Sequence, residues 1–330
     1  MSTRGTDSGL STLIIRFSSL GDVVLTAAVT AAVGNVIFVT HRRYADLARR
    51  LPGVKAVVAL EPGESVSSLA RRIPPSDRVV DLHGSARSRA LCLLLGRTVQ
   101  RLSTKGFARR MRVAMKAPER IETVVERYCE AAGVPVPAAP WLPLPRRGPA
   151  GGLGIVPMAA HANKRWPVRK WVGLVKRWEG PVWALGGPGE AAALREIQTQ
   201  SEREIEVVAE NGFGRTFEVL ESVSVVVGGD TGLMHLAAVC GVPVVGIYGP
   251  TTSSDGFWCH PGIVVEEALS CRPCTRYGGA VCPIGDHACM EEIAVEAVLS
   301  AIQKVLDPVG SRVVQGMECG ELEERIETAS

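Results

Sequence analysis

One stretch of the chain indicates the fold class: residues 223–238 read VSVVVGGDTGLMHLAA. An apolar run leads into two glycines and Asp230, and a helical pattern then continues to Gly241 and Pro243, which are typical of a helix end. The order strand, glycine loop, helix is that of a βα unit. Repeated βα units build parallel sheets that carry helices on both faces.

The same rhythm recurs on both sides of residues 134–152, which hold six of the 21 prolines. Successive prolines join neither a helix nor a central strand, so this segment is expected to be an extended linker. We predict an α/β protein with two Rossmann-like parallel-sheet domains, residues 1–145 and 146–306, and a polar tail, residues 307–330. A cleft is expected between the carboxyl ends of their strands. The apolar runs expected to be strands are residues 13–17, 36–39, 57–60, 79–82, 153–156, 182–185, 206–209, 223–227 and 244–248.

Length and composition narrow the class of protein. The chain has 330 residues, 46% of them hydrophobic and 22% charged, as in globular rather than disordered proteins. No apolar run approaches the roughly 18–20 residues of a membrane helix, and residues 1–10 lack the core of a signal peptide. We therefore expect a cytoplasmic protein. No dinucleotide fingerprint and no phosphate-binding loop of the P-loop kind occurs, which argues against nicotinamide and P-loop kinase chemistry.

Charge is unevenly distributed along the chain. Residues 1–150 carry 23 Lys and Arg against 11 Asp and Glu, whereas the remainder carries 14 against 23. A dense basic cluster over residues 97–120 suggests an anionic partner, although a solvated helix face explains the charge equally well. The cluster contains only Phe107 as a stacking aromatic, so nucleic acid is not the expected partner.

The nine cysteines are an odd number without a signal peptide, which indicates reduced thiols. Four of them have the spacing C-x2-C-x7-C-x6-C: Cys271, Cys274, Cys282 and Cys289. This spacing is similar to that of a metal knuckle but lacks a second close pair. Two interpretations stay open: a structural zinc that holds an irregular loop, and unmetallated thiols. Four thiolates would leave no open coordination position for catalysis.

The helix that follows residues 223–227 predicts an anion site at its N-terminus. Its free N–H groups and dipole attract negative charge, and Gly232 lets a phosphate approach the backbone. Asp230 is interpreted as an N-cap or as an acceptor for sugar hydroxyls, because it would repel a phosphate. His235, one turn into the helix, is placed to donate to a phosphate oxygen, but a histidine at such a place is more often a satisfied core residue.

Two further loops follow apolar runs. Lys164 lies in HANKRWP, residues 161–167, where a lysine at the carboxyl end of a strand can reach a ligand; a surface Lys-Arg pair is the plainer interpretation. Asp22 ends SSLGD, residues 18–22, after the first strand. By default it caps a helix, and across a cleft from a phosphate site it becomes a candidate general base.

Together these segments resemble glycosyltransferase family 9, the lipopolysaccharide heptosyltransferases. The most specific stretches are residues 16–22 (RFSSLGD), 164–167 (KRWP) and 229–238 (GDTGLMHLAA), and the resemblance runs from about residue 13 to 306. It implies a GT-B fold and an inverting, metal-independent transfer of heptose from ADP-heptose to the inner core of lipopolysaccharide. No cofactor is required in that mechanism.

The resemblance also implies residue roles. Asp22 matches the general base and Lys164 the lysine that steadies the leaving diphosphate. Asp230 matches a residue that binds donor-sugar hydroxyls, and Glu218 one that binds the ribose. The diphosphate loop is matched by Thr231, Gly232, Leu233 and His235.

The sequence departs from the family pattern at Ala160, where a Ser or Thr hydroxyl commonly meets the phosphate. The loss is one hydrogen bond to a charged group, about 1.5–3 kcal/mol, unless His161 or Asn163 supplies it.

The acceptor side is the least specific part of the resemblance. Its candidate residues are Ser19, Gly21, His83 and Arg87. A lipopolysaccharide acceptor implies peripheral association with the inner face of the cytoplasmic membrane, which the basic first half would favour. Alternatives are a protein or other glycan acceptor, a nucleotide-sugar-binding protein without turnover, and a metal-binding regulatory domain on a transferase shell.

Overall fold

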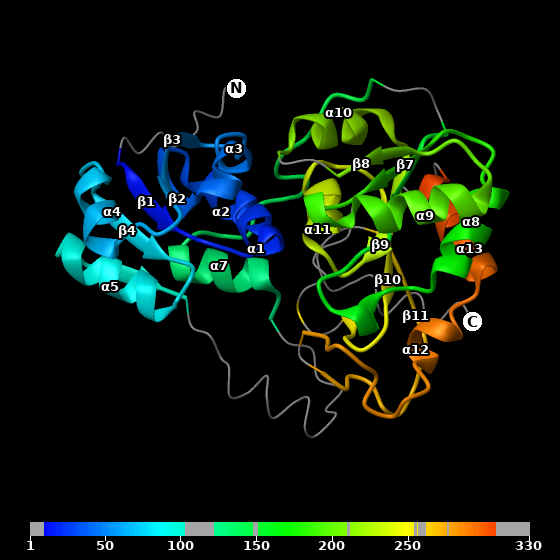
Figure 1. The fold of residues 1–330 in the computed structure, drawn as a ribbon. Helices are drawn as coiled ribbons and strands as arrows, with labels where there is room; N and C mark the ends of the chain where they lie inside the picture. The colour runs from blue at the N-terminus through cyan, green and yellow to red at the C-terminus, as the bar shows by residue number, and fades with distance from the viewer. Residues whose placement is uncertain are drawn as a thin grey trace. The chain divides into compact units, whose positions relative to one another are not determined.

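The computed structural model describes residues 10–102, 122–147, 151–209, 212–253, 256, 262–275 and 277–307. The chain divides into two compact units. Of the described residues, 10–102 and 124–142 form the N-terminal unit, and 122–123 together with those from Pro143 onward form the C-terminal unit. Each unit contains one parallel sheet flanked by helices (Figure 1). Of the basic cluster over residues 97–120, Arg97 and Arg101 lie within the described residues.

The N-terminal sheet has the strand order β3-β2-β1-β4-β5, and every neighbouring pair is parallel. Its strands are β1 (Thr12–Ile15), β2 (Val36–His41), β3 (Val54–Leu60), β4 (Arg78–Asp81) and β5 (Val99–Arg101). Its helices are α1 (Leu20–Leu25), α2 (Ala27–Val33), α3 (Ala45–Ala48), α4 (Val66–Arg72), α5 (Ala86–Leu95) and α7 (Val124–Ala132), with a 3-10 turn at Arg42–Tyr44.

Side chains of β1 pack on both faces of the sheet, because successive residues of a strand point to opposite faces. Leu13 and Ile15 pack in one core with Leu69 of α4 and Leu91 of α5. Helix α7 contacts α1, α2, β4 and β5. The helix that comes last in this unit is therefore built into its body.

The C-terminal sheet has the order β11-β10-β9-β6-β7-β8 and is also parallel throughout. Its strands are β6 (Leu153–Val156), β7 (Val182–Leu185), β8 (Glu206–Val208), β9 (Val225–Gly229), β10 (Val244–Tyr248) and β11 (Ile263–Glu266). Its helices are α8 (Val168–Arg177), α9 (Ala191–Ser201), α10 (Gly214–Ser222), α11 (Gly232–Val239), α12 (Ala288–Glu291) and α13 (Val295–Leu306), with 3-10 turns at Ala162–Lys164 and Pro188–Glu190.

One large core joins this sheet to α8, α9 and α13. Leu153 and Val227 from the strands meet Trp171 of α8, Leu194 of α9 and Ile302 of α13, and all five side chains are buried. Valines dominate the strands, as expected where both faces of a parallel sheet are covered. This core fixes the strand ends that carry the loops described below.

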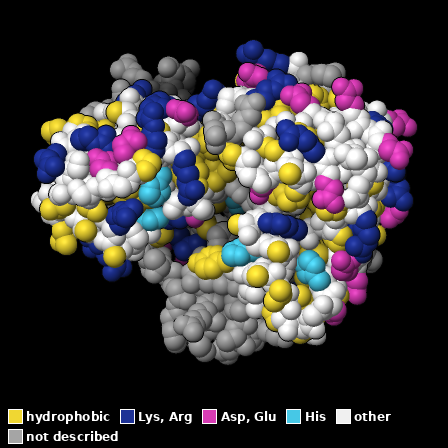
Figure 2. All heavy atoms as spheres, viewed as in Figure 1, with side chains coloured by type: hydrophobic (Ala, Val, Ile, Leu, Met, Phe, Trp, Pro, Cys, Tyr) yellow, Lys and Arg dark blue, Asp and Glu magenta, His cyan; other side chains and the backbone are white. Residues whose placement is uncertain are grey.

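Each of the nine apolar runs coincides with a strand, while β5 and β11 were not predicted. Among the described residues no helix is both long and apolar enough to cross a membrane. The uneven charge of the sequence is visible on one face of the molecule, where Asp and Glu side chains gather mainly on the C-terminal unit (Figure 2).

Candidate functional site

The order of strands reverses at one point in each sheet: between β1 and β4 in the N-terminal unit, and between β6 and β9 in the C-terminal unit. Open parallel sheets bind ligands at the carboxyl ends of strands beside such a point. Asp22 and His83 follow β1 and β4, and Lys164 and Asp230 follow β6 and β9. The predicted residues thus lie at the two places where the topology favours a ligand.

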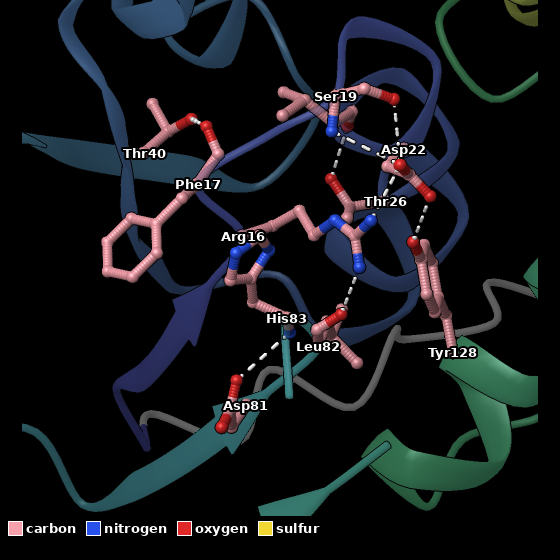
Figure 3. A network of polar contacts seen from close by, with 11 residues as sticks. Arg16, Phe17, Ser19, Asp22, Thr26, Thr40, Asp81, Leu82, His83 and Tyr128 are labelled. Atoms are coloured by element: carbon pink, nitrogen blue, oxygen red, sulfur yellow. Dashed lines mark hydrogen bonds and ion pairs between the residues drawn. The ribbon is translucent and has the colours of Figure 1, made fainter. Parts of the chain in front are cut away.

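Arg16 connects the two strand ends of the N-terminal unit (Figure 3). Its side chain is buried and comes directly after β1. Nη1 donates to the carbonyl oxygen of Leu82, just after β4, at 2.5 Å. Nη2 forms an ion pair with Oδ2 of Asp22 at 2.6 Å. The guanidinium also lies over the ring of Tyr128, 5.5 Å from its centroid. One cation therefore holds the loop, the neighbouring strand end and α7 together.

The carboxylate of Asp22 is hydrogen-bonded at both oxygens. Oδ2 accepts from the backbone N–H of Ser19 at 3.1 Å and from its hydroxyl at 2.8 Å, in addition to Arg16. Oδ1 accepts from the hydroxyl of Tyr128 at 2.9 Å. The expectation that Asp22 is a helix N-cap is wrong: Ser19 occupies the N-cap, and Asp22 stands at the third helical position.

These contacts determine the charge of the network. Burial opposes ionisation of Asp22, but Arg16 and the hydrogen bonds from Ser19 and Tyr128 outweigh it and hold the pKa of Asp22 below its ordinary value. Burial and the neighbouring Asp22 charge raise the pKa of Tyr128 well above its ordinary value. At neutral pH the network therefore consists of a charged carboxylate, a charged guanidinium and a protonated phenol.

His83 lies beside this network, edge-on to Phe17 with ring centroids 5.1 Å apart. Burial and the charge of Arg16 lower the pKa of His83 to about 4, so its ring is neutral at pH 7. Its buried Nδ1 has no hydrogen-bond partner among the described residues. Its backbone N–H donates to Asp81, which is fully buried at the end of β4. The ring is held in place, and one of its nitrogens is buried without a partner among the described residues.

The other acceptor-side candidates differ in exposure. Ser19 is exposed and Gly21 is buried in α1. Arg87 is exposed in the first turn of α5. Ser19 and Gly21 thus lie with Asp22 at the start of α1, whereas Arg87 lies in a different helix.

In the C-terminal unit, Lys164 and Asp230 form an ion pair with Nζ and Oδ2 2.5 Å apart, and each side chain is only 9% exposed. Nε2 of His235 lies 3.4 Å from the other oxygen of Asp230. Burial alone would raise the pKa of Asp230, but Lys164 and His235 lower it far below its ordinary value. The plain interpretation of Lys164 as a surface residue is therefore wrong, because its ammonium is buried against a carboxylate.

Helix α11 begins where the sequence predicted, at Gly232. Its N-cap is Thr231 and not Asp230, so the interpretation of Asp230 as an N-cap is wrong. The first N–H groups of a helix have no partner within the helix, and those of Gly232 and Leu233 belong to this set. The hydroxyl of Thr231 is buried without a partner among the described residues. This turn offers donors to an anion beside Lys164 and Asp230.

Glu218 lies on the surface of α10, where its carboxylate accepts from Nη1 of Arg215 at 2.7 Å. The structure does not bring it into contact with Asp230 or Lys164. Asn163, considered as a substitute for the hydroxyl missing at Ala160, is 4% exposed, and its side chain bonds to the backbone of Gly279 and Val281. It is therefore committed elsewhere.

The four clustered cysteines lie between β11 and the end of α12. Cys271, Cys274 and Cys282 are partly buried, and Cys289 is buried. Burial raises the pKa of Cys289 to about 11, which disfavours its thiolate. Within the described part of the chain, no group of three or more His, Cys, Asp or Glu is arranged to hold a metal ion. A structural zinc stays a prediction, which elemental analysis of the purified protein tests.

Residues 146–279 match the sequence model of glycosyltransferase family 9 (heptosyltransferase). This segment of the chain is therefore similar to glycosyltransferase family 9. The chain is 25% identical to lipopolysaccharide heptosyltransferase 1 of Pseudomonas aeruginosa over 80% of this chain and 86% of that protein. It is 32% identical to lipooligosaccharide heptosyltransferase 2 of Campylobacter jejuni over 81 residues, 24% of this chain and 25% of that protein. This second match spans about a quarter of the relative's length.

Similarity to a solved structure extends over most of the chain. The solved ADP-heptose lipopolysaccharide heptosyltransferase II of Escherichia coli superposes with a TM-score of 0.66 at 21% identity, covering 90% of this chain and 98% of that one. With the two parallel sheets described above, this similarity confirms the GT-B fold expected from the sequence.

Two residues of the candidate site were missed by the sequence analysis as site residues. Arg16 was quoted only as part of a motif, although a cation directly after the first strand is a signal that could have been used. Tyr128 carries no such signal, because it is 106 residues from Asp22 and lies outside the segment matched by the family model.

Proposed function

We propose that the protein transfers heptose from ADP-heptose to the inner core of lipopolysaccharide, with inversion at the anomeric carbon and without a catalytic metal ion. The match of residues 146–279 to the family 9 model supports a glycosyltransferase, and the curated relatives that the chain resembles are heptosyltransferases of lipopolysaccharide or lipooligosaccharide. The name of the E. coli relative supports ADP-heptose as the donor.

The observation that carries the proposal is the buried pair of Lys164 and Asp230 beside the first turn of α11. A cation, a turn of free N–H groups and His235 together suit the two phosphates of a nucleotide sugar. In the proposed reaction Lys164, the N–H groups of Gly232 and Leu233, and His235 stabilise the ADP that departs. Asp230 would accept hydrogen bonds from hydroxyls of the donor sugar. Glu218 is proposed to bind the ribose.

On the acceptor side, Asp22 would take the proton of the attacking hydroxyl. As that oxygen bonds to the anomeric carbon, the bond from this carbon to the phosphate oxygen breaks and ADP leaves with its electron pair. The lowered pKa of Asp22 keeps the carboxylate ionised at neutral pH and ready to accept the proton. Oδ1, which accepts from Tyr128 alone among the described residues, has the greater capacity for one more hydrogen bond. Ser19, Gly21, neutral His83 and Arg87 are the proposed acceptor contacts.

The proposed location of the protein in the cell follows from the lipopolysaccharide acceptor. A lipopolysaccharide precursor at the inner face of the cytoplasmic membrane would bring the protein to that surface peripherally. The excess of Lys and Arg in residues 1–150 would favour an anionic membrane surface.

The test combines binding and turnover. Wild type and Asp22→Asn are titrated with ADP-heptose by calorimetry, and release of ADP is followed with extracted inner-core acceptor. We expect equal donor affinity, with turnover by the variant lower by a factor of about 10² to 10⁴. Wild-type turnover by Asp22→Asn would overturn the role of the base. Binding of another nucleotide sugar in place of ADP-heptose would overturn the donor.

The same assay separates the alternative functions. Turnover with a protein or another glycan, and none with inner-core acceptor, would show that the proposed donor is right and the proposed acceptor is wrong. Donor binding with no turnover on any acceptor would indicate a nucleotide-sugar-binding protein.

A further inference from the structure

Lys164 lies in a short turn that is hydrogen-bonded to a second loop. The turn is Ala162–Lys164, and the loop that contacts it comprises residues 277–287, more than a hundred residues later in the sequence. Asn163 is the contact point: its N–H donates to the carbonyl of Gly279 at 3.2 Å, and its Oδ1 accepts from the N–H of Gly279 at 2.7 Å. Asn163 Nδ2 donates to the carbonyl of Val281 at 3.4 Å. The ring Nε2 of His287 lies 2.6 Å from the carbonyl oxygen of Asn163.

Gly278 brings the same loop against the side chain of Lys164 itself. A Cβ atom at this position would lie 2.8 Å from Cδ of Lys164 and 2.7 Å from Cβ of His161. Both distances are below those that real Cβ atoms tolerate. The backbone of the loop is therefore packed onto the methylene chain of Lys164, and only a residue without a side chain fits there.

We propose that the 277–287 loop is a positioning element for Lys164, and that Gly278 and Asn163 are its positioning residues. The proposal rests on the proposed function, in which the ammonium of Lys164 binds the diphosphate of the donor. A lysine side chain is flexible, and ordering it on binding opposes affinity. The loop orders the side chain of Lys164 before the donor binds, because it packs along the methylenes while the ammonium lies against Asp230. The donor then meets a cation that is already in position.

The loop supplies its own matched control. Gly278 has a φ of +101° and Gly285 a φ of +92°, so alanine meets the same kind of backbone strain at both positions. A Cβ at Gly285, however, has no atom within 4 Å. Gly278→Ala and Gly285→Ala therefore differ mainly in the contact with Lys164 and His161.

The experiment measures two ligands by calorimetry on the full chain: ADP, which has the diphosphate, and adenosine, which lacks it. We expect Gly278→Ala to weaken ADP binding by about 10- to 30-fold, the size of one ordered lysine side chain, and to leave adenosine binding unchanged. Gly285→Ala should bind both ligands as the wild type does. Equal ADP affinity of the two variants, or a parallel loss of both ligands in Gly278→Ala, would overturn the proposal.

Two further variants keep the test decisive. If Gly278→Ala fails to fold, Asn163→Ala removes the side-chain bonds to Gly279 and Val281 and should give the same selective loss of ADP. Lys164→Met tests the underlying function, because it removes the ammonium and retains a long apolar chain. If Lys164→Met binds ADP like the wild type, the proposed role of Lys164 fails. If Lys164→Met weakens ADP binding while Gly278→Ala and Asn163→Ala do not, only the positioning role fails.

Discussion

Tyr128→Phe removes one hydrogen bond from the carboxylate of Asp22 and little else. The ring of Tyr128 is buried, with 1% of its surface exposed, and a phenyl ring fills the same space. The lost contact is the 2.9 Å bond from its hydroxyl to Oδ1. A hydrogen bond to a charged group contributes about 1.5–3 kcal/mol, and we expect the lower part of this range because Oδ2 keeps its contacts with Arg16 and Ser19. Stability at pH 7 should therefore fall by about 1.5–2 kcal/mol.

The dependence of this deficit on pH identifies its cause. The pKa of Asp22 is lowered in the folded protein, so its contribution to stability is fully present above the unfolded value, about 4, and is lost as the pH falls through the folded value. Without Tyr128 the folded pKa moves up towards the ordinary value. The difference between wild type and variant should thus be complete at pH 7 and shrink below about pH 4.

Urea unfolding followed by circular dichroism at several pH values between 3 and 7 measures both quantities, with the two units allowed separate transitions. Val125→Ala on the same helix is the control: it removes buried methyl groups, and its cost of about 2 kcal/mol should not change with pH. A deficit for Tyr128→Phe below about 0.5 kcal/mol at pH 7, or one that is constant with pH, would refute the assignment of this bond.

Two further predictions concern the frame of each unit. Gly53→Ala should destabilise the N-terminal unit by about 1–3 kcal/mol more than Gly63→Ala. A Cβ at Gly53 would clash with the carbonyl oxygen of Thr30, whereas a Cβ at Gly63 meets no atom within 4 Å. Both glycines have a positive φ, so the backbone strain is shared, and thermal unfolding compares the two variants. Equal melting temperatures would contradict the clash. Arg272→Met should lower the free energy of unfolding, measured in urea, by about 3–5 kcal/mol. The guanidinium, whose side chain is 5% exposed, pairs with Glu266 and donates to the carbonyls of Gly249 and Thr251, which follow β10. A loss below about 1 kcal/mol would mean that water replaces it.

Much of the fold could be predicted because parallel strands covered on both faces consist of short apolar runs in the sequence. The two strands that were missed differ in kind. β5, Val99–Arg101, has exposed Gln100 and Arg101, and nothing in its sequence separates it from a loop. β11, Ile263–Glu266, does contain an apolar run, Ile263 to Val265, which was a usable signal.

The candidate site residues that the sequence singled out are those that follow strands. Lys164, Asp230 and Asp22 each lie just after a strand, where the topology and the motifs agree. The assignment of N-caps failed because a cap is fixed by the backbone at the turn, and Ser19 and Thr231 adopt the extended conformation that a cap requires. Partners distant in sequence could not be found at all, since pairing across a sheet depends on the fold.

The placement of α7 has a consequence for synthesis on the ribosome. Arg16 and Asp22 are made before Tyr128, which covers one and donates to the other and follows 106 residues after Asp22. At about 5–20 residues per second, the nascent chain waits roughly 5–20 s for this helix. Until α7 has emerged, the ion pair at the end of β1 lacks its cover, and the N-terminal unit cannot complete its folding. The first half of this protein is therefore finished only when synthesis of the second is close to beginning.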